Sequence, residues 1–312
     1  AASGGSVRVE AGSGLSHDGS GGGDVFIAGG NSASYVNTPN AAGGSVSITG
    51  GSSTRSTSGS VRITSGNSEL ASSGATTIQT GSAGAQGQSG DLLVRTGSAV
   101  GSVGDLTIGT GASQKGAAGS VTLSVGSGVK GPGGDIVLQA GQQVGDRLAT
   151  ADGGSVHIMS GSSALSSSGA VLVSSADAGA SGSSGGVSLM TGAASSGPTG
   201  AISLSTGSSA DGSAGGISLS VGQSVGADGG KITLSAGDAN GANNGGSVTL
   251  LSGQSADRSS GSVEIATASS GTAGDSGTMT LTTGSSMGNS GDFVVASGDA
   301  VQGPGTISIV SG

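Results

Sequence analysis

The chain has 312 residues, of which 70 are glycine, 1% are aromatic, 9% are charged and none is cysteine, with a formal net charge of −9. This composition excludes a disulfide scaffold and lacks the basic stripe and stacking aromatics of nucleic-acid-binding proteins. No apolar run is long enough to cross a bilayer, so we expect neither a nucleic-acid partner nor a membrane span.

A motif of about fifteen residues recurs along the whole chain. Each copy has an apolar anchor residue, a second aliphatic residue two positions later, a glycine two positions before the anchor and usually a glycine five positions after it, as in Gly200–Gly207. Self-similarity at a fixed period is typical of solenoids. In chain order the anchors are Val7, Val25, Val46, Val61, Thr76, Leu92, Leu106, Val121, Ile136, Val156, Val171, Val187, Ile202, Ile217, Ile232, Val248, Val263, Met279, Phe293 and Ile307.

The alternation of large and small residues predicts a short strand at every anchor, from 7–9 to 307–309, with both aliphatic side chains on one face. The flanking glycines are expected to supply the corners, because glycine accepts backbone angles that a Cβ forbids. Extra residues fall between the second glycine of one copy and the first glycine of the next, as in Asn31–Ala42 and Gln142–Gly153. Insertions at one place in each repeat predict loops along one edge of a solenoid.

The predicted fold class is therefore all-β, a parallel β-solenoid (β-helix) of about twenty 15-residue coils with a thin Val/Ile/Leu core. Residues 1–312 are expected to form a single continuous solenoid, a segment of a longer repeat protein or filament, because the chain starts and ends within a repeat. At about 4.8 Å per coil the rod would span roughly 95 Å. One repeat per coil is favoured over two because no odd/even pattern is visible, and Ser209, Ser224 and Ala239 would then point inward.

No catalytic or metal-binding constellation is visible. The two histidines, His17 and His157, lie about nine repeats apart, and no thiol is present. The stretch Gly21–Asp24 resembles calcium-binding solenoid repeats, but those need aspartate in tandem, and here aspartate precedes the anchor in only five copies. We therefore predict that the protein is not an enzyme and needs no cofactor or metal.

Hydroxyl side chains occupy the positions between and after the aliphatic pairs. On stacked strands they would form a ladder with steps of about 4.8 Å, a spacing that ice-binding solenoids use. Charged or bulky residues such as Arg62, His157 and Glu264 interrupt the rows, so a merely solvated face is the alternative. The candidate surface that would bind ice or polysaccharide comprises Ser188, Ser203, Ser205, Ser218, Ser220, Thr233, Ser235, Thr249, Thr280 and Thr282.

Strings such as Gly44–Ser53 resemble the Gly/Ser/Thr-rich repeats of surface and secreted proteins from diatoms and other stramenopile algae. A second resemblance is to the head repeats of trimeric autotransporter adhesins, although there the glycine follows the second aliphatic directly. The first resemblance implies extracellular or cell-surface matrix, adhesive or filament roles, and the second implies a trimer with a collagen-binding role. The leading hypothesis is accordingly a structural protein that self-associates end to end or laterally, and the alternative is an ice- or polysaccharide-binding protein.

Overall fold

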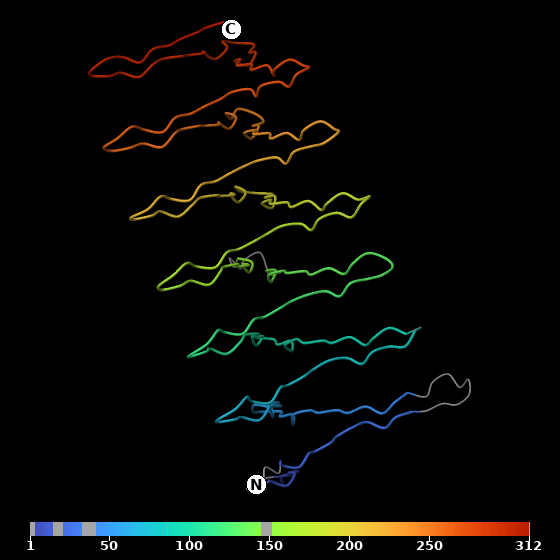
Figure 1. Cartoon of the computed structure of the whole chain (residues 1–312). Helices are drawn as coiled ribbons and strands as arrows, with labels where there is room; N and C mark the ends of the chain where they lie inside the picture. The colour runs from blue at the N-terminus through green and yellow to red at the C-terminus, as the bar shows by residue number, and fades with distance from the viewer. Residues whose placement is uncertain (1–3, 15–20, 33–41, 86, 145–151, 312) are drawn as a thin grey trace. The chain divides into compact units, whose positions relative to one another are not determined.

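The computed structural model describes residues 4–14, 21–32, 42–85, 87–144 and 152–311. Within these ranges the backbone forms no helix and no strand, and Figure 1 draws extended runs joined by narrow loops. The chain divides into two units, Ala1–His157 and Ile158–Gly312. The predicted all-β solenoid of about twenty coils is therefore wrong. That residues 1–312 belong to one continuous domain stays a prediction.

The runs around the anchors are nevertheless extended, with the two aliphatic residues on one side. In the run around Ile202 the anchor is 52% exposed and Leu204 is 72% exposed, and large side chains of the other parity in other runs range from 71% at Leu93 to 86% at Leu172 and beyond. The Arg8 guanidinium contacts the Glu10 carboxylate at 2.6 Å, as expected for side chains two residues apart on extended backbone. The runs are thus extended, but the strands that the period of two predicted at the anchors do not form in the described ranges.

Extended runs do not become strands without a partner, because a strand is defined by a ladder of backbone hydrogen bonds to a neighbour. In the described ranges, backbone hydrogen bonds connect one repeat to the next in eight loops, and each of these loops has a single such bond. Each repeat offers two large side chains, and none of those in the described ranges is buried. Without a partner for its amides and carbonyls, an extended run does not become part of a sheet.

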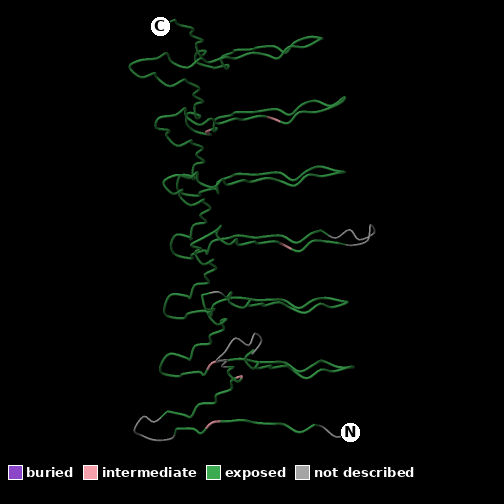
Figure 2. Cartoon of the chain, turned by 90° about the vertical axis from the view of Figure 1, so that its right-hand side faces the viewer, coloured by how far each residue is buried: buried purple, intermediate pink, exposed green. Residues whose placement is uncertain are grey.

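Burial is almost absent from the described residues. Figure 2 shows them nearly all exposed, and no side chain is buried, so the predicted thin Val/Ile/Leu core is also wrong. The accessible surface is 30708 Å², whereas a compact protein of 28.1 kDa would expose about 11000 Å². The few half-buried residues are Ala11, Gly29, Ser65, Ala140, Ala236 and Ser255.

The glycines that flank the anchors do not act as corners. Among the described residues, positive φ angles occur only within the connecting loops, for example at Gly131 (97°) and Gly226 (83°), and never beside an anchor. The expectation that motif glycines supply unusual backbone angles is therefore wrong. Several of the glycines two positions before an anchor instead have a neighbouring atom close to the place of a Cβ.

Candidate interaction surface

Each loop begins and ends with the same three positions. We call the residue four positions after an anchor the entry residue. The next residue is usually glycine and is then called the entry glycine. The glycine two positions before the following anchor is called the exit glycine. In the loop between Ile232 and Val248 these are Ala236, Gly237 and Gly246. The entry residue and the exit glycine meet at the base of the loop.

A backbone hydrogen bond closes some of these loops. In the loop that starts at Ala236, the Gly246 amide donates to the Gly237 carbonyl at 2.9 Å. The same bond between exit and entry glycines recurs at 2.8–3.1 Å in seven further loops. We call these eight the closed loops, and their glycine pairs are Gly12–Gly23, Gly30–Gly44, Gly51–Gly59, Gly66–Gly74, Gly141–Gly154, Gly161–Gly169, Gly237–Gly246 and Gly253–Gly261.

The size of the entry residue separates closed loops from open ones. Every closed loop has glycine, alanine or serine at this position, namely Ala11, Gly29, Gly50, Ser65, Ala140, Ser160, Ala236 and Ser252. The described loops that have an entry glycine but no such bond carry threonine or valine there, except for the loop that starts at Ser297. In that loop Pro304 directly precedes the exit glycine. Five of the six half-buried residues in the described ranges are entry residues.

Close contact at the loop base gives the physical reason. A Cβ added to exit glycine Gly246 would lie 3.3 Å from Ala236 Cβ, which is close but leaves the hydrogen bond intact. In the two open loops with an entry valine a γ-methyl fills this space: an added Cβ would lie 2.8 Å from Val125 Cγ1 at Gly134 and 2.7 Å from Val221 Cγ1 at Gly230. The extra methyl of valine therefore stands between the two glycine backbones of these loops and holds them apart.

Thr110 shows the alternative that a hydroxyl allows. Its Cγ2 would lie 3.3 Å from a Cβ on Gly119, and its Oγ1 donates a hydrogen bond of 3.3 Å to the Gly119 carbonyl. The side chain thus replaces the backbone bond of a closed loop with a longer contact of its own. At exit glycines such as Gly44, Gly134 and Gly230 a neighbouring side chain or backbone lies within 2.8 Å of the place of a Cβ, whereas Gly90, Gly104 and Gly291 have no neighbour within 4 Å of it.

Serine side chains fold the loop tips. In the loop after Val156, the Ser163 Oγ accepts a hydrogen bond from the Ser166 amide at 3.0 Å. Serines at the same position of five other repeats accept from the amide three residues later, and Ser286 accepts from the amide two residues later. Ser209 is one of them, so its predicted inward-facing role is wrong: the residue is exposed and shapes a tip. The seven serines are Ser53, Ser68, Ser113, Ser163, Ser209, Ser255 and Ser286.

The ten predicted hydroxyl residues all lie exposed on the extended runs, from Ser188 to Thr282. The Ser235 Oγ donates to the neighbouring Ala236 carbonyl at 3.2 Å. Because the described backbone has no strands, strand pairing does not impose the 4.8 Å steps that a ladder needs. The binding role of Ser188, Ser203, Ser205, Ser218, Ser220, Thr233, Ser235, Thr249, Thr280 and Thr282 stays a prediction.

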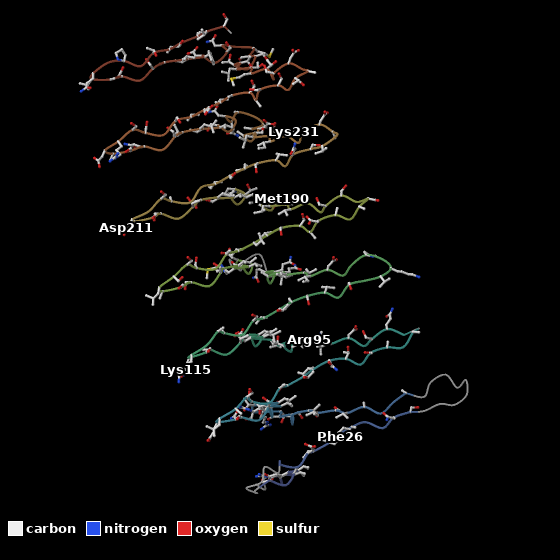
Figure 3. The ribbon with its side chains drawn as sticks, in the orientation of Figure 1. Phe26, Arg95, Lys115, Met190, Asp211 and Lys231 are labelled. Carbon is white, nitrogen blue, oxygen red and sulfur yellow. The ribbon has the colours of Figure 1, made fainter. Side chains whose placement is uncertain are left out.

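Charged side chains are exposed and dispersed. Lys115 and Asp211 lie at the tips of two loops, and Phe26 lies along an extended run (Figure 3). Over the described ranges, no group of three or more His, Cys, Asp or Glu side chains could hold a metal ion. His157 is exposed, and His17 lies outside the described residues. A search of the same ranges also finds no helix with the length and hydropathy needed to span a membrane.

Comparison with known proteins adds no relative. No family model, curated protein or solved structure matches the chain. The geometry of its loops and the placement of its exposed side chains therefore carry the functional argument.

Proposed function

We propose that the chain is a structural repeat protein of the extracellular space or cell surface, which self-associates into filaments or adhesive matrix and has no catalytic role. One observation carries this proposal: the aliphatic pair of every described repeat is about half exposed or more. Soluble monomers rarely expose apolar surface repeatedly along their whole length, and such surface marks sites of association.

The amount of surface supports association rather than a single docking event. The accessible area exceeds that of a compact protein of this mass by roughly 20000 Å². A standard protein–protein interface buries about 1600 Å² in total, so the chain has room for several such contacts. Burial of its regularly spaced aliphatic pairs between chains would be favourable at about 25 cal/mol per Å² before the loss of chain entropy is subtracted. Repeated weak contacts of this kind suit a filament or matrix.

Light scattering and electron microscopy of the purified chain over a concentration series test the proposal. We expect growing assemblies, and we expect their growth to fall when Leu204, Leu219 and Leu234 are replaced together by serine. These second aliphatic residues are 72%, 67% and 72% exposed, so their replacement removes apolar surface without opening a cavity. A matched control replaces the exposed loop residues Ser196, Ser213 and Asn244 by alanine. Persistent monomers at high concentration would overturn the proposal.

A second candidate function is binding of ice or polysaccharide by the ten hydroxyl residues, which are all exposed. Replacement of Ser203, Ser218 and Thr233 by lysine should then abolish thermal hysteresis or glycan binding and leave self-association intact. The loop serine Ser213, replaced by lysine, serves as the control. Equal binding by both variants would exclude a role for these hydroxyls.

A further inference from the structure

Both Asn-Gly sequences of the chain lie in one loop. They are Asn240–Gly241 and Asn244–Gly245, and no other asparagine of the sequence is followed by glycine. Both fall between the entry glycine Gly237 and the exit glycine Gly246, whose backbone bond of 2.9 Å closes the loop. A chemical change at either asparagine therefore acts on a segment whose two ends are joined by one hydrogen bond.

An asparagine followed by glycine is chemically labile. The backbone nitrogen of the next residue can attack the side-chain amide carbon and close a five-membered ring. Glycine offers the least obstruction to this attack, because it has no Cβ. Asparagine is accordingly among the thermolabile residues that proteins from hyperthermophiles contain less often. The attack requires an exposed asparagine and a following amide that no hydrogen bond holds.

Asn244 meets these requirements. Asn244 and Gly245 are exposed, and within the described ranges the Gly245 amide donates no hydrogen bond. A Cβ at Gly245 would have no neighbour closer than 3.8 Å, so the space around this residue is open. Gly212, which follows Asp211, shows the opposite arrangement, since its amide donates to Ser209 Oγ at 3.0 Å. The nitrogen that would attack is therefore available after Asn244 and engaged after Asp211.

We propose that Asn244 is a site of spontaneous deamidation by water, and that one of the two products opens the base of the loop. The Gly245 nitrogen bonds to Asn244 Cγ, the bond from Cγ to Nδ2 breaks, and Nδ2 leaves as ammonia with the proton that the Gly245 nitrogen loses. Water then opens the ring. No atom is oxidised or reduced, and water is the only co-reactant. This inference goes beyond the proposed structural function and does not depend on it.

The direction of ring opening decides the product. Cleavage of the bond between the Gly245 nitrogen and Cγ gives an ordinary aspartate at position 244. Cleavage of the bond between the same nitrogen and the main-chain carbonyl carbon gives isoaspartate, in which the backbone runs through Cγ. Both products replace a neutral amide by a carboxylate, but only isoaspartate lengthens the backbone, by one methylene group.

The two products differ in their effect on the loop base. Asp152 stands four residues before its anchor, as Asn244 does, and also precedes two glycines. The loop of Asp152 is closed by a bond of 2.9 Å from the Gly154 amide to the Gly141 carbonyl. An ordinary aspartate at position 244 is therefore compatible with a closed loop. The extra methylene of isoaspartate lies two residues before the Gly246 amide and displaces this donor from its acceptor.

The chemical part of the proposal is tested by ageing the whole chain in mildly alkaline buffer. The Asn240→Gln variant leaves residue 244 in the one remaining Asn-Gly sequence. Peptide mass mapping should show conversion of the amide to a carboxylate at Asn244 before Asn67 or Asn289, which are exposed but followed by serine. Conversion should quicken as the pH rises, because the deprotonated nitrogen attacks. Gly245→Ala should slow it severalfold, since the added methyl group obstructs the attack.

The structural part is tested by NMR hydrogen exchange at Gly246. Asn244→Asp is the reference for the ordinary product and should exchange like the fresh natural chain. The aged chain should show a second Gly246 signal that exchanges about two- to tenfold faster, the effect of losing one backbone bond. The proposal is wrong if Asn244 converts no faster than Asn67. It is equally wrong if every Gly246 signal of the aged chain exchanges as slowly as in Asn244→Asp.

Discussion

The entry residue is expected to decide whether a loop closes, and Ala236→Val tests this. In the closed loop the Gly246 amide donates to the Gly237 carbonyl at 2.9 Å, and Ala236 Cβ already lies 3.3 Å from the place of a Gly246 Cβ. Valine adds two γ-methyl groups to this contact. In the open loop at Val221 the corresponding methyl comes to 2.7 Å from the same place. We therefore expect Ala236→Val to break the backbone bond.

The magnitude follows from the value of one hydrogen bond. A backbone bond contributes about 0.5–1.5 kcal/mol net, which corresponds to a change in closed population of about two- to tenfold. Hydrogen exchange at the Gly246 amide, measured by NMR on the whole chain, should accelerate by this factor. The reciprocal variant Val221→Ala should slow exchange at Gly230 by a similar factor, because it removes the methyl groups that hold that loop open.

Ala236→Ser is the matched control, since serine occupies the entry position of closed loops at Ser65, Ser160 and Ser252. It should leave Gly246 exchange nearly unchanged. Unaltered exchange in Ala236→Val, or no slowing in Val221→Ala, would refute the steric explanation of open and closed loops.

Three further outcomes are expected. Ser163→Ala removes the acceptor of the Ser166 amide, so exchange at Ser166 should accelerate about two- to tenfold while Gly169 keeps its bond to Gly161; equal exchange before and after would contradict the tip role of the serine. Gly44→Ala would place a Cβ 2.8 Å from the Gly30 amide nitrogen, so the backbone bond between Gly30 and Gly44 should be lost and hydrogen exchange at residue 44 should accelerate. Gly43→Ala is the control, because its Cβ would have its nearest neighbour at 3.5 Å and should not accelerate this exchange. Because no described side chain is buried, calorimetry of the dilute chain should show no cooperative unfolding transition, and a sharp endotherm at dilution would contradict the absence of a core.

The difference between the expected solenoid and the observed chain lies in what a local pattern can specify. Alternation around Ile202 and Leu204 predicted a strand; the run there is extended, but no strand forms in the described residues. A strand also needs a neighbouring strand that forms hydrogen bonds with its amides and carbonyls, and no residue within the repeat specifies which segment that is. The predicted core failed for the same reason, since two aliphatic side chains per repeat are buried only when another segment covers them.

The candidate surfaces were predictable to different degrees. The exposure of hydroxyl residues such as Ser203 followed from their place between aliphatic residues, whereas their spacing would have needed strand pairing. The closed loops were not predicted, although the small size of residues such as Ala140 and Ala236 was visible in the sequence. The effect of these small residues on loop closure becomes visible only in the structure, where the entry residue contacts the exit glycine across the base of the loop.

The sequence by itself determined the period, the extended runs, the place of the loops and the signs of the charges, because each depends on neighbouring residues along the chain. Only the tertiary structure decided that glycines such as Gly246 are required by close approach rather than by backbone angle, and that Ala236 permits a loop bond that the methyl of Val221 prevents. These effects act between residues that lie about ten positions apart and meet across a loop base, so their cause is a contact in space.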